Sequence, residues 1–500
     1  MPKRFLIALL LLLFLFFPLL WISQYNYPSG EDYFIALQAR RLGALGATKW
    51  WYFSGAGRYS YLFLQSLISL SNSWLTIYKV FPGALLIAGF GSLYYFVRAF
   101  FGLAFSKTTL FILSATIYTL LISLTPDIAT GFYWLDTSLQ YAGAVFTSLL
   151  IFALFINLCR TKKSRSRMSY ALLMTILIAL LAGLNEVSVL LVIATFGLIN
   201  FLYLIEFKRL HTWSLAFLAL SVIFGLVSFL APGTQARVAE VGAEFHLLNV
   251  LAGAIGLTFY LLIDLLASTP LLPASIIYLA FLSAHRDKLE RVSSLLRRVR
   301  WHWILLFMLL SITAINFVIF TAVGVNSLTD RLKNIYVYSI FFGWLLLLTA
   351  LFFDLSRKKV NLSVPNWMMK VLVAGICGFL LTGYHLELGG KNIIPSASAS
   401  QRFFSQINTK SVYANAYLDI LSGRAERFSR QNEEREKQLL NATGDTVEFS
   451  LYSYVPATIF IQDVNHPFGD PEWQSAFICG QVKHLNYVET GPPPPPKEKF

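Results

Sequence analysis

The sequence predicts an all-α membrane protein with many spanning helices. Of its 500 residues, 56% are hydrophobic and only 13% are charged, and the mean hydropathy is +0.61. Such a composition is too apolar for a soluble protein and is typical of a polytopic helical membrane protein. In addition, Lys and Arg gather in short clusters between long apolar runs, a pattern that indicates repeated crossing of a bilayer.

The first apolar run, 5–22, follows Lys3 and Arg4 and is long enough to span a membrane. No small-residue cleavage site follows it, so we expect a retained span and not a signal peptide. The chain has three cysteines, which imply neither a disulfide framework nor a metal site. The net charge of +14 reflects basic loops between spans better than it reflects nucleic-acid binding.

Six basic clusters divide the chain. They are Lys3/Arg4, Arg98/Lys107, 159–167, Lys208/Arg209, 286–300 and 357–359. If all six face the cytoplasm, each interval between them must contain an even number of crossings. The intervals 108–158, 170–207, 212–285 and 301–356 then each supply an outward and a return span. With the first interval and a last span at 367–386, this predicts about eleven crossings.

Two segments do not fit this topology as simple spans. The first interval uses 5–22 and 76–97 as spans, so the short, Ser-rich segment 59–73 is expected to be an in-plane or re-entrant helix at the outer surface. Segment 247–284 is too long for one simple span, yet it must make one net crossing. We therefore expect a break near Pro270 and Pro273.

The topology places the unusual polar motifs on one outer face. These motifs are Glu31/Asp32, 50–58, 125–141, 183–186, 231–237 and 326–331. Polar groups at membrane depth are costly, so several of them on one side suggest a shared cavity.

The acidic pair Glu31/Asp32 directly follows the first span. The spacing Ser29-x-x-Asp32 is typical of a helix capping box, which is one interpretation. The alternative is that Asp32, or Glu31, is a catalytic base on the outer face. The stretch FIALQARRLGALG that follows is expected to be an interfacial helix.

Three arginines are candidates for binding phosphate. Arg58 lies among aromatic residues just after Gly55 and Gly57, while Arg237 and Arg331 each follow the end of a span. A guanidinium group can bind phosphate through two parallel hydrogen bonds. The alternative for each arginine is an interfacial anchor to lipid headgroups.

The remaining candidates are polar or aromatic residues near the outer ends of spans: Trp51, Tyr133, Trp134, Asp136, Asn185 and Glu186. The aromatic residues either stack on a sugar or form an interfacial belt. The carboxylate of Glu186 requires a partner at this depth. If the site is functional, the partner is Arg237, Arg331 or a bound cation. The alternative is that Glu186 forms an ion pair with a purely structural role. The sequence therefore leaves open whether a divalent cation binds, and it implies no cofactor.

The C-terminal part differs in character from the membrane part. We expect a membrane domain over 1–386 with its first outer loop at 23–75, an extracytoplasmic domain over 387–490, and a flexible Pro-rich tail over 491–500. Within the second domain, a charged helix over 422–445, strands at 446–453 and 457–462 and a helix at 470–482 predict a small α/β appendage.

Taken together, several motifs resemble the GT-C superfamily of membrane glycosyltransferases. They are GEDYF, Trp51-x(5)-Gly57-Arg58, YWLDTSLQY, GLNE, APGTQAR and DPEWQSAFICGQV. More specifically, the chain resembles bacterial GT-C-like relatives of O-antigen glucosyltransferases. The resemblance covers most of the chain, although each motif is short. GT-C enzymes commonly have an acidic pair in the first outer loop, which corresponds here to Glu31 and Asp32.

The resemblance implies an inverting transferase at the outer face of a bacterial inner membrane. Its donor would be a polyprenyl-phosphate sugar, and its acceptor a glycan or a lipid-linked molecule. Arg58, Arg237 and Arg331 would then bind the donor phosphate, and Asp32 would be the base. Two alternatives stay open: a transporter or flippase of a lipid-linked glycan, and a glycan polymerase or ligase with a diphosphate-linked donor.

Overall fold

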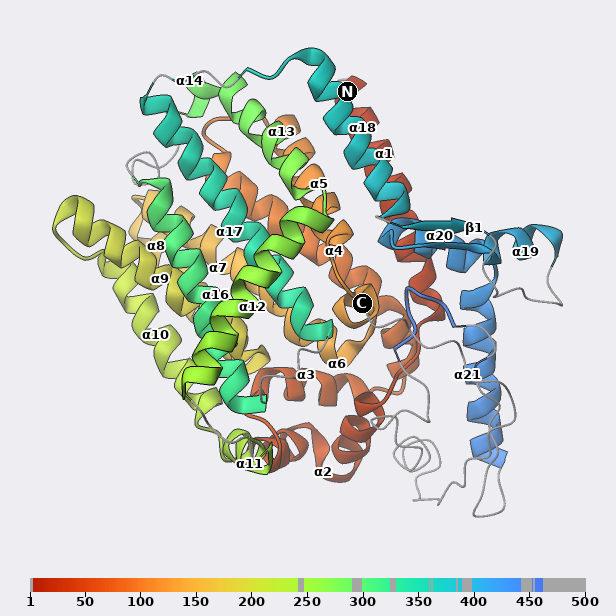
Figure 1. Cartoon of the computed structure of the whole chain (residues 1–500). Coiled ribbons are helices and arrows are strands. Elements are labelled where there is room, and N and C mark those ends of the chain that lie inside the picture. The colour runs from red at the N-terminus through yellow and green to blue at the C-terminus, as the bar shows by residue number, and fades with distance from the viewer. Residues whose placement is uncertain are drawn as a thin grey trace.

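Figure 1 shows a computed structural model of the chain. The structure describes residues 3–241, 247–289, 299–323, 330–358, 360, 363–383, 385–388, 398–441, 452 and 455–461.

Helices form most of the described part of the chain and confirm a multi-pass α-helical membrane protein. In the described residues, nine helical segments are long and apolar enough to cross a membrane. They are α1 (Lys3–Ile22) with η1 (Ser23–Tyr25), α4 (Trp74–Phe101), the run from α6 to α7 (Ala144–Arg160), α8 (Ser164–Leu184), α9 (Glu186–Phe207), α10 (Thr212–Phe229), α12 (Leu247–Ser268), α16 (Trp301–Val323) and α17 (Asp330–Arg357). Three shorter apolar helices are α5 (Lys107–Ser123), α13 (Leu271–Ala284) and α18 (Asn366–Thr382).

The outward faces of these helices are hydrophobic. Leu172 and Ile176 on α8 are 61% and 55% exposed, and Ile7 on α1 is 58% exposed. Large apolar side chains over so much outer surface are expected where lipid tails, and not water, surround the protein.

The predicted break in segment 247–284 is confirmed. Helix α12 ends at Ser268 and α13 begins at Leu271, with Pro270 between them. Proline lacks the N–H that would continue the helical hydrogen bonds, so it favours this boundary. The shorter α14 (Arg286–Leu289) follows α13.

Several short helices close one end of the bundle, which we call the site end. Helices α2 (Glu31–Ser54) and α3 (Tyr59–Ser69) lie across it, next to α11 (Pro232–Val241), at the bottom of Figure 1. Helix α2 is kinked at Gly43, whose φ of 72° favours glycine. Between α5 and α7 the chain forms η2 (Ala129–Tyr133), α6 (Leu135–Ser138) and η3 (Leu139–Gly143).

The basic loops meet at the opposite end, which we call the basic end. Figure 1 shows the N-terminus and α14 there, at the top. Arg160, at the end of α7, donates hydrogen bonds to the carbonyls of Ala99 and Phe100 at the end of α4. Arg286 of α14 donates to the carbonyl of Ser356 at 2.6 Å. The basic clusters at 98–107 and 159–167 therefore lie together, as do the described parts of those at 286–300 and 357–359.

The described C-terminal residues pack on the bundle. Strands β1 (Leu386–Leu388) and β2 (Ile407–Thr409) pair antiparallel, and the helices are α19 (Ala399–Ser405), α20 (Val412–Leu421) and α21 (Arg424–Asn441). Helix α20 packs against α1, and the Tyr27 hydroxyl donates to Glu433 of α21 at 3.3 Å.

The strand prediction for 457–462 is wrong in its described part. Residues 457–459 form a turn, because the side chain of Asp419 accepts hydrogen bonds from the backbone N–H and the hydroxyl of Thr458, at 2.9 and 2.8 Å. The predicted helix 470–482 and almost all of the predicted strand 446–453 lie outside the described residues, as does the tail 491–500.

Candidate functional site

Two glycine-containing turns pack together at the site end and position Arg58. The N–H of Gly57 donates to the Thr234 hydroxyl at 2.9 Å, and the Ser228 hydroxyl donates to the Gly57 carbonyl at 3.0 Å. A Cβ on Gly57 would come within 2.1 Å of the Ser228 carbonyl oxygen, so only glycine fits there. The motifs around Arg58 and Arg237 therefore fit together through their backbones.

Arg58 is held by two acceptors from distant segments. Its Nε donates to Glu186 Oε2 at 2.8 Å, and its Nη1 donates to the side-chain oxygen of Gln140. Burial opposes the positive charge, but the carboxylate of Glu186 more than offsets this and raises the pKa of Arg58 above its usual value. Arg58 is thus a charged residue that links α3, η3 and the start of α9.

Asp32 is fully enclosed, and both of its carboxylate oxygens accept hydrogen bonds. Oδ2 accepts from the N–H of Ser29 at 2.9 Å, whereas Oδ1 accepts from Gln65 Nε2 at 2.8 Å and from the N–H of Asp136 at 3.2 Å. Burial raises the pKa of Asp32 to about 7, although the backbone N–H donors of Ser29 and Asp136 partly oppose the shift. Asp32 therefore binds Ser29, the residue that precedes the N-cap of α2, Gly30, and also ties α2 to α3 and α6.

Asp136 lies at the centre of the site. Its Oδ1 accepts a hydrogen bond from the Tyr61 hydroxyl, and its backbone carbonyl accepts one from Gln140 Nε2 at 2.8 Å. Its Oδ2 is buried without a hydrogen bond and lies 3.9 Å from Nη1 of Arg331. A buried carboxylate oxygen with only this long contact is able to accept a further donor from a ligand.

Glu31 is the most accessible carboxylate of the group. Its side chain is 36% exposed, and its Oε2 lies 3.7 Å from Nη1 of Arg331. The Arg331 guanidinium also lies over the Trp134 ring, 5.9 Å from its centre. Both separations exceed a hydrogen-bond length, so Arg331 is held more loosely than Arg58.

We call Glu31, Asp32, Arg58, Asp136, Glu186 and Arg331 the charged cluster. It joins residues from α2, α3, α6, α9 and α17, and its four carboxylates face two guanidinium groups. In the described part of the chain, no three His, Cys, Asp or Glu side chains form a group suited to a metal ion.

The other sequence candidates whose side chains the structure describes lie outside the charged cluster. Tyr133 is fully buried and donates to the Leu19 carbonyl, so its ring belongs to the core. Asn185 caps α9 by accepting from the N–H groups of Val187 and Ser188. The Trp51 ring stacks edge-on against Phe34. Arg237 is part of α11, but its side chain lies outside what the structure describes.

Sequence reasoning missed three residues of the site: Tyr61, Gln65 and Gln140. Each is a hydrogen-bond partner of a charged side chain or of its backbone. Gln65 carries a detectable signal, because it is a lone amide within the apolar run YSYLFLQSLIS.

Comparison with known proteins does not identify the chain. No protein-family model, no curated protein and no solved structure matches it. The geometry of the charged cluster therefore carries the functional argument.

Proposed function

We propose that the protein is a membrane glycosyltransferase of the GT-C type. It would transfer a sugar from a polyprenyl-phosphate donor to a glycan or lipid-linked acceptor, at the site end of the bundle. One observation supports this most: carboxylates and arginines from five distant segments meet where the spans end. Transfer from a lipid-phosphate sugar needs a base for the acceptor hydroxyl and a cation for the phosphate, and both are needed where the spans end.

In this proposal the carboxylates have different roles, because they differ in exposure and in hydrogen bonding. Glu31 is the accessible base in this proposal, because a base must lie within hydrogen-bond reach of the acceptor hydroxyl. Asp32 is a positioning residue, since its two oxygens already bind protein donors. As Glu31 takes the proton of the acceptor hydroxyl, that oxygen attacks the anomeric carbon, and the lipid phosphate leaves with the electrons of the broken C–O bond.

Arg331 is the phosphate-binding residue in this proposal, and the buried ring of Trp134 beside it supports its guanidinium. Its contacts with Glu31 and Asp136 are long, so a phosphate can replace them without breaking a short ion pair. Arg58, by contrast, is committed to Glu186 and Gln140.

We expect Arg331→Lys to weaken donor binding by about tenfold or more, because lysine cannot form the two parallel hydrogen bonds of a guanidinium group. Arg58→Lys is the matched variant: it should lower the thermal midpoint but change donor affinity less, since its main loss is the bridge between Glu186 and Gln140. Titration of purified protein with a polyprenyl-phosphate sugar measures both. Unchanged affinity in Arg331→Lys would remove Arg331 from the phosphate site.

We further propose that the basic end faces the cytoplasm of a bacterium and the site end faces outward, since basic loops are retained inside. In a variant with Cys159, Cys377 and Cys479 replaced by Ser, an impermeant thiol reagent added outside intact cells should label Ser73→Cys and not Ser164→Cys. Both positions are exposed, at opposite ends of the bundle. The reverse labelling would contradict this orientation.

A further inference from the structure

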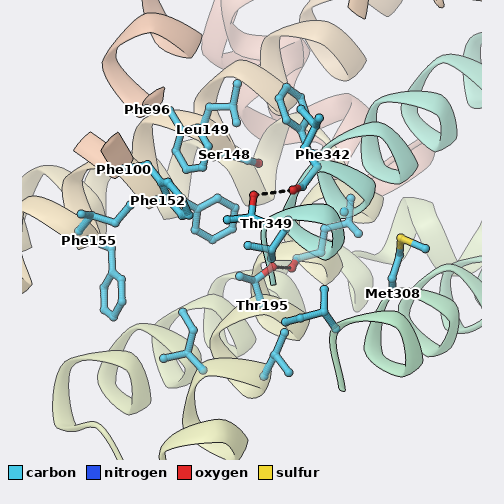
Figure 2. Close-up of a pocket in the computed structure, with 18 of the residues that line it drawn as sticks. Phe96, Phe100, Ser148, Leu149, Phe152, Phe155, Thr195, Met308, Phe342 and Thr349 are labelled. Atoms are coloured by element: carbon cyan, nitrogen blue, oxygen red, sulfur yellow. Dashed lines mark hydrogen bonds between the residues drawn. The ribbon is translucent and has the colours of Figure 1, made fainter. Parts of the chain in front are cut away.

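A second feature, an apolar cavity inside the bundle, is separate from the charged cluster. Its volume is about 520 Å³, and its walls come mainly from α4, α7, α9, α16 and α17. Figure 2 shows aromatic side chains of α4 and α7 lining it, including Phe96, Phe100, Phe152 and Phe155, with Met308 and Phe342 contributed by α16 and α17.

The cavity is long and follows the spans. Its lining residues on α9 run from Ser188 to Tyr203. At 1.5 Å per residue these are separated by roughly 22 Å along the helix axis. That is most of the roughly 30 Å hydrocarbon thickness of a bilayer, so the cavity has the length of a lipid chain and not of a small solute.

The cationic and thiol side chains that line the cavity lie at its basic end, whereas hydroxyl groups line it along its length. Arg160 is the one permanently charged residue lining it, within the part of the chain that the structure describes. His211 and Cys159 line the same end, with His211 Nε2 at 3.8 Å from Cys159 Sγ. The loop after Arg160 adds the exposed residues Lys162 and Lys163. A cavity that is cationic at one end and lined mostly by apolar side chains matches an anionic amphiphile.

Arg160 retains donors for such a ligand. Its hydrogen bonds to the Ala99 and Phe100 carbonyls use two of the five N–H groups of a guanidinium. The side chain is exposed at the end of α7, where a headgroup in the adjacent leaflet is within reach.

We propose that this cavity binds one hydrocarbon chain of an anionic phospholipid whose phosphate is bound by Arg160. The phospholipid enters from the leaflet at the basic end. It is distinct from the proposed sugar donor, because Arg58 and Arg331 lie at the site end and do not line the cavity. The site is therefore independent of the proposed function, and it would fill a void that otherwise separates the spans.

Delipidated protein in detergent, titrated with dioleoyl phosphatidylglycerol and followed by native mass spectrometry, tests the site. We expect one phosphatidylglycerol per chain, bound at least about tenfold more tightly than dioleoyl phosphatidylcholine. Arg160→Gln should remove this preference. Ser148→Trp and, independently, Thr195→Phe should abolish binding, since both side chains line the cavity and a larger ring would fill it.

Two matched controls separate this site from lipid on the outer surface. Arg165→Gln removes a charge at the same end but not from the cavity, and Leu172→Trp adds bulk on the outward face of α8. Both should bind phosphatidylglycerol as the unmodified protein does. Equal affinity for the two lipids, or equal loss of binding in Leu172→Trp and the two cavity-filling variants, would overturn the proposal.

Discussion

Glu31→Gln is expected to reduce sugar transfer by about 10²–10⁴-fold, because glutamine keeps the size of the side chain but cannot accept a proton. Glu31 is the carboxylate that is both accessible and only loosely paired, with Oε2 at 3.7 Å from Arg331. Donor affinity should be at least as high as in the unmodified protein, since the substitution frees Arg331 from a competing carboxylate. Turnover and donor titration on the same preparation measure the two effects separately.

The control for Glu31→Gln is Glu426→Gln. Glu426 is an exposed glutamate of α21 that pairs with Arg430 one helical turn later, far from the charged cluster in the sequence. Glu426→Gln should leave sugar transfer unchanged. If Glu31→Gln retains full transfer while the fold is intact, Glu31 is not the base, and Asp136, with its unpaired Oδ2, becomes the next candidate.

Asp32→Asn is expected to lower both the stability and the activity. A helix cap alone would tolerate the change, because asparagine caps about as well as aspartate. In this structure, however, three N–H donors point at the two carboxylate oxygens, so the asparagine NH₂ must face at least one of them. A buried donor without an acceptor costs about 1–3 kcal/mol. We expect a lower thermal midpoint and weaker transfer, because α6 and Asp136 lose their support.

The stability difference between the unmodified protein and Asp32→Asn should depend on pH. Because burial raises the pKa of Asp32 from 3.8 to about 7, the folded protein holds this proton more tightly than the unfolded chain. The resulting stabilisation is fully present at low pH and is lost as the pH rises through about 7. The stability advantage of the unmodified protein over Asp32→Asn should therefore shrink between about pH 4 and pH 8. Thermal midpoints that differ by the same amount across this range would show that Asp32 does not titrate there.

The fold class was predictable because it depends on composition and on the spacing of basic clusters. Apolar runs of span length and the break at Pro270 are local properties, and both appear in the structure. The strand prediction for 457–462 failed because a tertiary contact, from Asp419 to Thr458, decides the backbone there. Local strand propensity is easily outweighed by such contacts.

The charged residues of the candidate site are all among the sequence candidates, but their pairing was not predictable. The sequence leaves Arg237, Arg331 or a cation as the partner of Glu186, whereas the structure pairs it with Arg58. That pairing depends on how α3 packs against α8 and the start of α9, which no single motif contains. Likewise, the capping pattern predicts the contact of Asp32 with the Ser29 N–H but not that Gly30 is the N-cap, and the burial of Asp32 and its contacts with Gln65 and Asp136 arise only in the folded bundle.

The central claim is that the protein breaks a bond between a sugar and a lipid phosphate. The most direct measurement uses purified protein in liposomes with a polyprenyl-phosphate sugar, radiolabelled in the sugar, and a candidate glycan acceptor. We expect label to become attached to the acceptor, one free polyprenyl phosphate to appear for each sugar transferred, and Glu31→Gln to suppress both. Movement of the intact labelled lipid between leaflets, with no free polyprenyl phosphate, would contradict the account and indicate a transporter.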